Sequence, residues 1–185
     1  ALSVRKGPGV ARQAALDVAR YDQQGCYSPH VFYVQRGAQL SPQDFAQHLA
    51  NELAALQHKL PRRVLSLEEA AQVGAWREAH ELASLNHDAQ RDTEISSTSL
   101  NNTTYTVLGS GRGTSTVVYS DRALPLSAGP LNRCVLVVAV DTLDEVMPLI
   151  TPQRDYLQTV GLAAAPEELL QLGERLGQAI WRRLH

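Results

Sequence analysis

The sequence predicts an α/β domain with a largely parallel sheet flanked by helices and an antiparallel hairpin extension. Helical and strand-like runs alternate along the chain, which favours parallel strands joined by helices. The run from Cys134 to Val140 is continuously apolar, as is typical of a strand covered on both faces. The alternating runs Tyr105 to Leu108 and Thr116 to Tyr119 predict the hairpin. We expect a single domain over residues 1–185 with a core of its own.

The first predicted helix covers Gly9 to Tyr21. Its apolar residues Val10, Ala14, Val18 and Tyr21 recur with the period of one helix face. We therefore expect these four side chains to face the core.

A strand and a second helix are predicted next. Val31 to Gln35 is short and rich in β-branched and aromatic residues. Ser41 is a strong N-cap because Pro42 follows it at the first helical position. This helix is expected to end before Pro61.

The third predicted helix begins at Ser66, where Glu69 completes a capping box, and is expected to run to about Leu85. The polar residues 86–102 predict a surface loop. Three elements follow the apolar strand. They are a short helix capped by Asp141 or Thr142 and ending near Pro148, a strand over Leu157 to Ala163, and a helix from Pro166 to Leu184.

Composition excludes several classes of protein. The net charge of −2 gives no electrostatic reason to expect nucleic acid as a partner, and no apolar run is long enough to cross a bilayer. Two cysteines do not have the spacing of a metal site, and free thiols favour a reducing compartment, so we expect a cytoplasmic protein without a metal. Because Ala1 is not Met, we expect the chain to be a piece of a longer protein.

Cys26 is the leading candidate for a catalytic residue. It lies between the first helix and the first strand, on a turn that follows Gly25. A thiol is partly ionised at neutral pH and is a strong nucleophile, and a backbone N–H at such a turn can stabilise an oxyanion. Gln23 and Gln24 are expected to offer amide hydrogen bonds. The competing interpretation is a buried cysteine that fills a gap in the core.

Other reactive side chains have simpler explanations. Cys134 lies inside the apolar strand and is expected to be core. His80 and His87 lie in or after the third helix, and pairing of either with Cys26 would suit a thiol hydrolase. His30 is close to Cys26 in sequence and is a weaker candidate for tuning the thiol.

Two further patterns are not interpreted as sites. The glycine-rich segment Gly109 to Gly113 is followed by a strand pattern, whereas a dinucleotide fingerprint opens a helix, so it predicts a hairpin turn. The acidic pairs Glu68-Glu69 and Glu167-Glu168 are each explained as residues in the first turn of a helix.

The segment from Asp22 to Pro29 resembles the nucleophile region of the aldehyde dehydrogenase superfamily. It is more closely similar to the acyl-CoA reductase branch, which forms fatty aldehyde in bacterial bioluminescence. A glutamine shortly before Cys26, then Ser28-Pro29, then a strand carry the resemblance, and Leu157 to Gly161 resembles a late motif of that branch. The order of helices and strands is also similar to the superfamily's catalytic domain.

The resemblance implies a function. Cys26 would be the acylated nucleophile, with Gln23, Gln24, Gly25 and Ser28 shaping its site. An acyl-CoA or acyl-carrier thioester would be reduced to an aldehyde with hydride from NADPH. The cofactor-binding domain would lie elsewhere in the same protein, so this domain alone would show no nicotinamide-dependent turnover. Self-association would use strands near Thr104 to Ser120.

One stretch departs from the superfamily's pattern. Aldehyde-oxidising members carry Glu-x-Phe-Gly-Pro, which holds the cofactor ribose, whereas the comparable stretch here is Ala128 to Arg133 and has neither the glutamate nor the phenylalanine. No cofactor-binding residue is therefore assigned. Two alternatives to the reductase stay open. They are a cysteine acyltransferase or hydrolase that pairs Cys26 with a histidine, and a non-enzymatic interaction domain.

Overall fold

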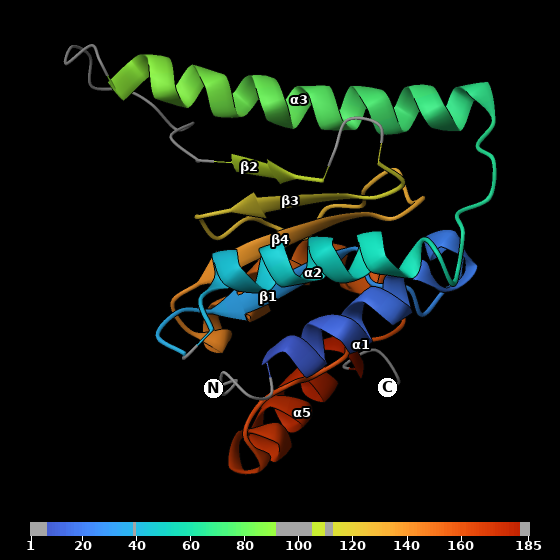
Figure 1. Ribbon diagram of the computed structural model, residues 1–185. Coiled ribbons are helices and arrows are strands. Elements are labelled where there is room, and N and C mark those ends of the chain that lie inside the picture. Colours follow the sequence, from blue (N-terminus) through green and yellow to red (C-terminus); the bar gives the residue numbers. More distant parts are fainter. Residues whose placement is uncertain (1–6, 39, 92–104, 110–112, 182–185) are drawn as a thin grey trace.

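A mixed sheet with helices packed against it forms the centre of the fold (Figure 1). The computed structural model describes residues 7–38, 40–91, 105–109 and 113–181. In these residues the sheet has the strand order β1-β4-β3-β2. β4 pairs in parallel with β1 and β3, and β2 pairs antiparallel with β3. The predicted fold class is confirmed, hairpin included. The strands are β1 (Val31–Gln35), β2 (Tyr105–Leu108), β3 (Thr116–Ser120) and β4 (Cys134–Val140).

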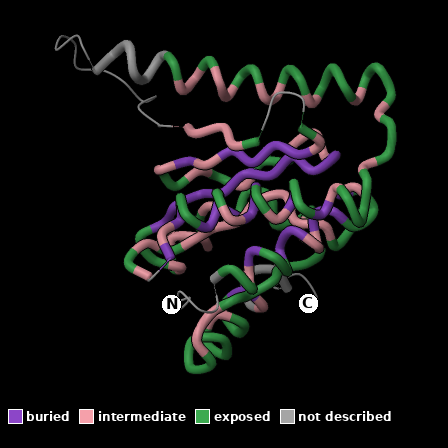
Figure 2. Tube along the Cα trace, viewed as in Figure 1, coloured by how far each residue is buried: buried purple, intermediate pink, exposed green. Residues whose placement is uncertain are grey.

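The inner strand β4 separates two hydrophobic clusters. All of its residues are buried, as Figure 2 shows for the centre of the sheet. Successive side chains of a strand point to opposite faces. Val135 and Val137 accordingly belong to one cluster, and Leu136 and Val138 belong to the other. This double coverage explains why the sequence of β4 is apolar without alternation.

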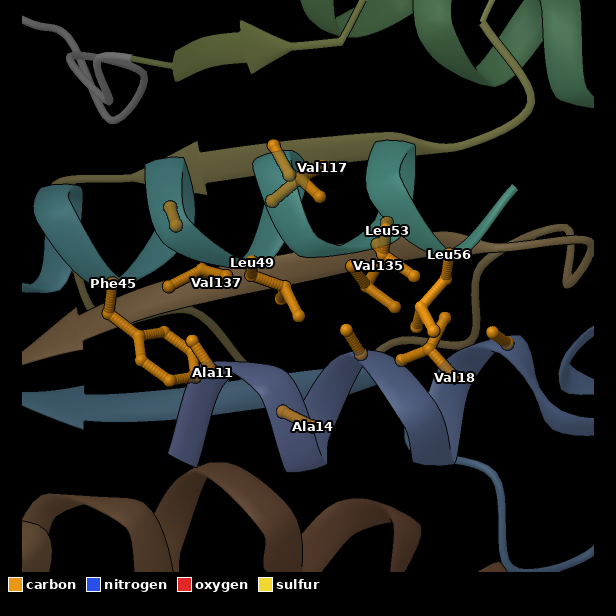
Figure 3. Close-up of a cluster of buried hydrophobic side chains, with 14 of the residues drawn as sticks. Ala11, Ala14, Val18, Phe45, Leu49, Leu53, Leu56, Val117, Val135 and Val137 are labelled. Carbon is orange, nitrogen blue, oxygen red and sulfur yellow. The ribbon is translucent and has the colours of Figure 1, made fainter. Parts of the chain in front are cut away.

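Two helices, α1 (Gly7–Ala19) and α2 (Pro42–Leu56), cover one face of the sheet. Their apolar side chains fill the space between the helices and the strands, as Figure 3 shows. Leu49 and Leu53 of α2 are fully buried there, as is Val18 of α1. This cluster fixes the position of α1, the helix that leads into the Cys26 turn.

Side chains from several helices and loops cover the second face of the sheet. Trp76 of α3 (Leu67–Arg91) packs there, together with side chains from η2 (Leu143–Glu145) and α4 (Val146–Ile150). The chain then continues through η3 (Thr151–Tyr156) to α5 (Pro166–Trp181), which contacts η3. None of the helices in the described part of the chain combines the length and apolar character needed to cross a bilayer.

The predicted starts of the second and third helices are confirmed by their capping hydrogen bonds. The Ser41 hydroxyl accepts a hydrogen bond from the Asp44 N–H at 3.1 Å. At the start of α3, Ser66 and Glu69 form both bonds of the capping box, at 2.9 and 3.1 Å. These bonds satisfy N–H groups that a helix terminus leaves without partners.

Two sequence predictions are wrong. Leu157 to Ala163 forms no strand and runs as an irregular, mostly exposed connection between η3 and α5. The first helix ends at Ala19, before Tyr21, whose side chain is 82% exposed instead of facing the core.

The region after Leu85 differs in part from its prediction. Helix α3 continues to Arg91, so residues 86–91 are helical where a loop was predicted. The rest of that predicted loop, residues 92–102, lies outside the described residues.

The packing between α1 and α2 gives a first testable prediction. Leu49→Ala should lower the free energy of unfolding by about 3 kcal/mol, because Leu49 is fully buried and its truncation leaves a cavity. Urea denaturation measures this change. Leu67→Ala is the matched control, since Leu67 is 88% exposed, and it should change stability by less than about 0.5 kcal/mol. Equal losses in the two variants would contradict this packing.

Candidate active site

Shortly after α1 the backbone changes from the right-handed to the left-handed helical region. Tyr21, Asp22 and Gln23 all have positive φ, at 54°, 51° and 66°. Left-handed backbone costs a residue with a Cβ roughly 1–2 kcal/mol. Gln24 returns to the right-handed region, and its N–H donates to the Tyr21 carbonyl at 2.9 Å. A stretch of this kind persists only where other contacts hold it.

Gln23 supplies the first of these contacts. Its side chain is 1% exposed. Its Nε2 donates to the Pro29 carbonyl at 2.7 Å and to the Cys134 carbonyl at 3.0 Å. Its Oε1 accepts from the Cys134 N–H at 3.0 Å. The amide therefore ties both the turn and the start of β1 to the first residue of β4.

A buried ion pair supplies the second contact. Arg133 Nη2 lies 2.6 Å from Asp22 Oδ1, and their side chains are only 2% and 12% exposed. The guanidinium also donates to Gln57 Oε1 at 3.3 Å and to the Ala19 carbonyl at 3.4 Å. The second carboxylate oxygen of Asp22 accepts from the Arg63 N–H at 3.1 Å. Both charges are thus well supplied with partners, as buried charges must be.

Arg133 belongs to a second left-handed segment. Leu131, Asn132 and Arg133 have φ values of 61°, 56° and 67°. Asn132 is buried, and its Oδ1 accepts from Gln24 Nε2 at 3.3 Å. The stretch noted in the sequence for lacking a cofactor-binding motif therefore contacts the segment that precedes Cys26.

Cys26 lies on the turn that these contacts hold. The Ser28 N–H donates to the Gly25 carbonyl at 2.9 Å and closes the turn. The thiol of Cys26 is exposed. It borders an open depression of about 540 Å³ whose lining includes Asp17 and Arg20 as well as residues 24–28. A substrate can therefore reach the sulfur from solvent.

Gly25 leaves one side of this turn open. A Cβ placed there would lie 3.4 Å from Ser28 Oγ and 3.8 Å from the Tyr21 ring. These are ordinary contact distances, and the φ of Gly25 is not positive. The backbone at this position therefore does not require glycine.

Cys134 is buried at 1% exposure, as predicted. Burial raises the pKa of its thiol to about 11. Its sulfur is therefore protonated and shielded at neutral pH. Only Cys26 of the two cysteines has the accessibility that thiol chemistry requires.

The predicted alternative pair of Cys26 and His80 is not supported by the fold. The His80 ring stacks on Trp76 and Tyr105, and its Nδ1 lies 2.7 Å from the Trp76 carbonyl. Tyr105 pairs with Ser120, the last residue of β3, whereas Cys26 precedes the first residue of β1 at the opposite edge. Strand spacings of about 4.8 Å and a rise of about 3.3 Å per residue separate these corners by roughly 20 Å. The side chain of His87 lies outside the described residues.

His30 opens β1 near the turn. Its backbone carbonyl accepts from the Leu136 N–H at 3.1 Å. Its Nδ1 is buried and has no hydrogen-bond partner among the described residues. Burial lowers the pKa of His30. The doubly protonated ring must carry a proton on Nδ1, which would be a buried donor without an acceptor, so this environment disfavours the charged form.

Neither a cluster of metal ligands nor a dinucleotide fingerprint at Gly109 to Gly113 is found in the described part of the chain. No three His, Cys, Asp or Glu side chains within the described ranges lie close enough together to hold a metal ion. Gly109 and Gly113 flank the connection between the antiparallel strands β2 and β3, which is the hairpin that the sequence predicted. A helix N-terminus, which a dinucleotide fingerprint needs, does not follow them.

Comparison with known families accounts for almost the whole chain. The family model described as acyl-CoA reductase (LuxC) matches residues 8–180. The chain belongs to this family. The resemblance inferred from the Cys26 segment is thereby confirmed, and membership in the LuxC family indicates an enzyme that reduces fatty acyl-CoA to aldehyde. The search of curated proteins finds no match.

The difference in exposure between Cys26 and Cys134 in this LuxC-family chain gives a second prediction. A maleimide should modify Cys26 in the native protein, because that thiol is exposed, and should modify Cys134 only after denaturation. Intact-mass measurement counts the adducts. Cys26→Ser should abolish native labelling, and Cys134→Ser should leave it unchanged. Slow labelling of Cys26 in the native state would contradict its accessibility and would favour a non-enzymatic domain.

His30 gives a third prediction. Its pKa is lowered on folding, so the unfolded chain binds the extra proton as pH falls through about 6.5. The wild-type free energy of unfolding should therefore decrease as pH falls from 7 towards 5. Urea denaturation across this range should show a smaller decrease for His30→Gln. Identical pH profiles for wild type and His30→Gln would contradict the burial of this ring.

Proposed function

We propose that this chain is the nucleophile-bearing domain of a fatty acyl-CoA reductase and that Cys26 carries the acyl group. The observation that supports the proposal is the exposed Cys26 sulfur, held on a turn that Gln23 anchors to β4, in a chain of this family. An anchored, accessible thiol meets the geometric need of covalent catalysis. The thiol borders a depression into which a thioester can enter.

The acyl transfer follows from thiol chemistry. The Cys26 thiol loses its proton to solvent, and the thiolate attacks the thioester carbonyl carbon. A new carbon–sulfur bond forms to Cys26 while the bond to the sulfur of coenzyme A breaks. Coenzyme A leaves as a thiolate, which takes up a proton. The backbone N–H of Cys26 is the proposed donor to the carbonyl oxygen as negative charge develops there.

The supporting residues receive different roles in this proposal. Gln23 cannot turn its amide to the substrate without giving up its bonds to Pro29 and Cys134, so we assign it to positioning. Gln24 is exposed and lines the depression with Gly25 and Ser28. These three residues are proposed to shape the approach to the sulfur of Cys26.

Reduction of the acyl-enzyme needs a hydride donor. The glycine-rich connection between β2 and β3 joins two antiparallel strands, so it does not have the strand–turn–helix context of a dinucleotide fingerprint. On the resemblance to the family, we propose that NADPH supplies the hydride and that a further domain of the same protein binds it. We make no assignment of this chain's residues to the cofactor.

We also propose self-association, through a shorter segment than the one that the sequence indicated. The sequence pointed to strands near Thr104 to Ser120. In the described sheet β3 is flanked on both sides by strands, and β2 is at the edge. The edge of β2 is therefore the part of this segment that a second copy would pair with.

Acylation of Cys26 is the fourth prediction. The full-length protein, incubated with hexadecanoyl-CoA and no reduced nicotinamide, should gain one acyl group, because transfer to the thiol does not need hydride. Peptide mass spectrometry should locate the group on Cys26. Cys134→Ala should retain the adduct, and Cys26→Ala should lose both the adduct and the reductase activity. Full reductase activity in Cys26→Ala would overturn the proposal.

A further inference from the structure

Three contacts join the chain around the two left-handed segments, which are residues 21–23 and 131–133. The side chains of Asp22 and Arg133 form the buried ion pair. The side chain of Gln23 bonds to the backbone of Cys134, next to Arg133. Gln24 donates to Asn132. Three consecutive residues, 22–24, thus contact residues 132–134, and together we name these contacts the clasp.

The ion pair is the part of the clasp whose hydrogen bonds restrict the relative position of the two segments most strictly. Arg133 directs its Nε and Nη2 to the same oxygen of Asp22, at 2.8 and 2.6 Å. Its remaining contacts reach Gln57 and the end of α1 at Ala19. A guanidinium has donors in a fixed planar fork, so it meets all three partners only when the segment after α1 is left-handed.

The clasp determines where Cys26 lies relative to the sheet. Arg133 directly precedes Cys134, the first residue of β4, and Asp22 lies four residues before Cys26. Without the pair, the residues after Ala19 lose one of the two buried contacts that hold them left-handed, and right-handed backbone is the default for such residues. A right-handed path would carry the turn in a different direction from the end of α1.

We propose that Asp22 and Arg133 are positioning residues that hold the Cys26 turn in the orientation in which its thiol is acylated. The inference rests on the proposed function of Cys26. Neither residue lies on the turn itself, and Arg133 is too deeply buried to meet the substrate. Both act through the backbone between Gln23 and Ser28.

The test removes the pair without leaving a charge buried alone. The double variant Asp22→Asn/Arg133→Met replaces both charges with neutral side chains of similar volume, a change that proteins with buried ion pairs can tolerate. Hydrogen exchange by mass spectrometry on peptides covering residues 20–30 reports the order of the turn, and circular dichroism reports the fold. We expect native circular dichroism with exchange in this segment at least about tenfold faster.

Acylation of Cys26 by hexadecanoyl-CoA is followed in the same variant of the full-length protein. A displaced nucleophile lowers the maximal rate of transfer, and a displacement of about 1 Å can cost roughly 100-fold. We therefore expect the maximal acylation rate to fall by roughly that factor while the half-saturating concentration of hexadecanoyl-CoA changes little. A purely structural role for the pair would not separate these two quantities.

Val140→Ala is the matched control. Val140 is fully buried at the other end of β4, so its truncation lowers global stability without touching the clasp. Exchange in residues 20–30 and the maximal acylation rate should stay within about twofold of wild type. Should the control and the double variant change both readouts equally, or should exchange stay unchanged in the double variant, the positioning role is overturned.

The outcomes also separate this inference from the proposed function. If wild-type protein forms no adduct on Cys26, the proposed function fails whatever the clasp does. If wild type is acylated and the double variant is acylated at the same maximal rate, the positioning role fails and the role of Cys26 stands.

Discussion

The attachment of the segment after α1 to the first residues of β4 is the constraint on which the rest of the site depends. Tyr21, Asp22 and Gln23 adopt backbone conformations that their side chains disfavour. Two sets of buried polar contacts offset the free-energy cost of these conformations. The side-chain amide of Gln23 forms hydrogen bonds with the backbone at the start of β4, and Arg133 forms an ion pair with Asp22. The exposed thiol of Cys26 therefore lies on a rigid support although the turn itself faces solvent.

The direction of the strands determines at which end of the sheet Cys26 lies. The chain passes from α1 through the turn into β1, so Cys26 lies at the amino ends of the parallel strands. Open α/β sheets usually bind ligands beyond the carboxyl ends of their strands. The nucleophile proposed for this LuxC-family chain departs from that rule, because Cys26 lies on the connection into a strand. A cofactor-bearing domain would have to approach from this amino edge.

Residues close together in the sequence could be interpreted correctly because their signals are local. The capping residues Ser41 and Ser66, the apolar strand β4 and the junction that carries Cys26 all follow from short-range patterns. The strand predicted over Leu157 to Ala163 failed, since composition alone cannot show whether a sheet edge is within reach. The predicted contribution of Tyr21 to the core failed because handedness reverses after Ala19.

The contacts that support the Cys26 turn could not be predicted from the sequence, and the reason is physical. Asp22 and Arg133 are separated by 111 positions in the chain, and neither belongs to a spacing motif. Three consecutive left-handed residues without glycine are not signalled by composition, because their conformation depends on tertiary contacts. The one available hint was a charged residue placed directly before the fully apolar strand β4.

The most direct measurement of the central claim is an X-ray structure of the protein trapped with an acyl group in the absence of reduced nicotinamide. The account predicts electron density for the acyl chain continuous with the Sγ of Cys26, with the Gln23 amide still bonded to the backbone of Cys134. Density attached elsewhere, or an acylated Cys26 with Gln23 released from β4, would contradict it.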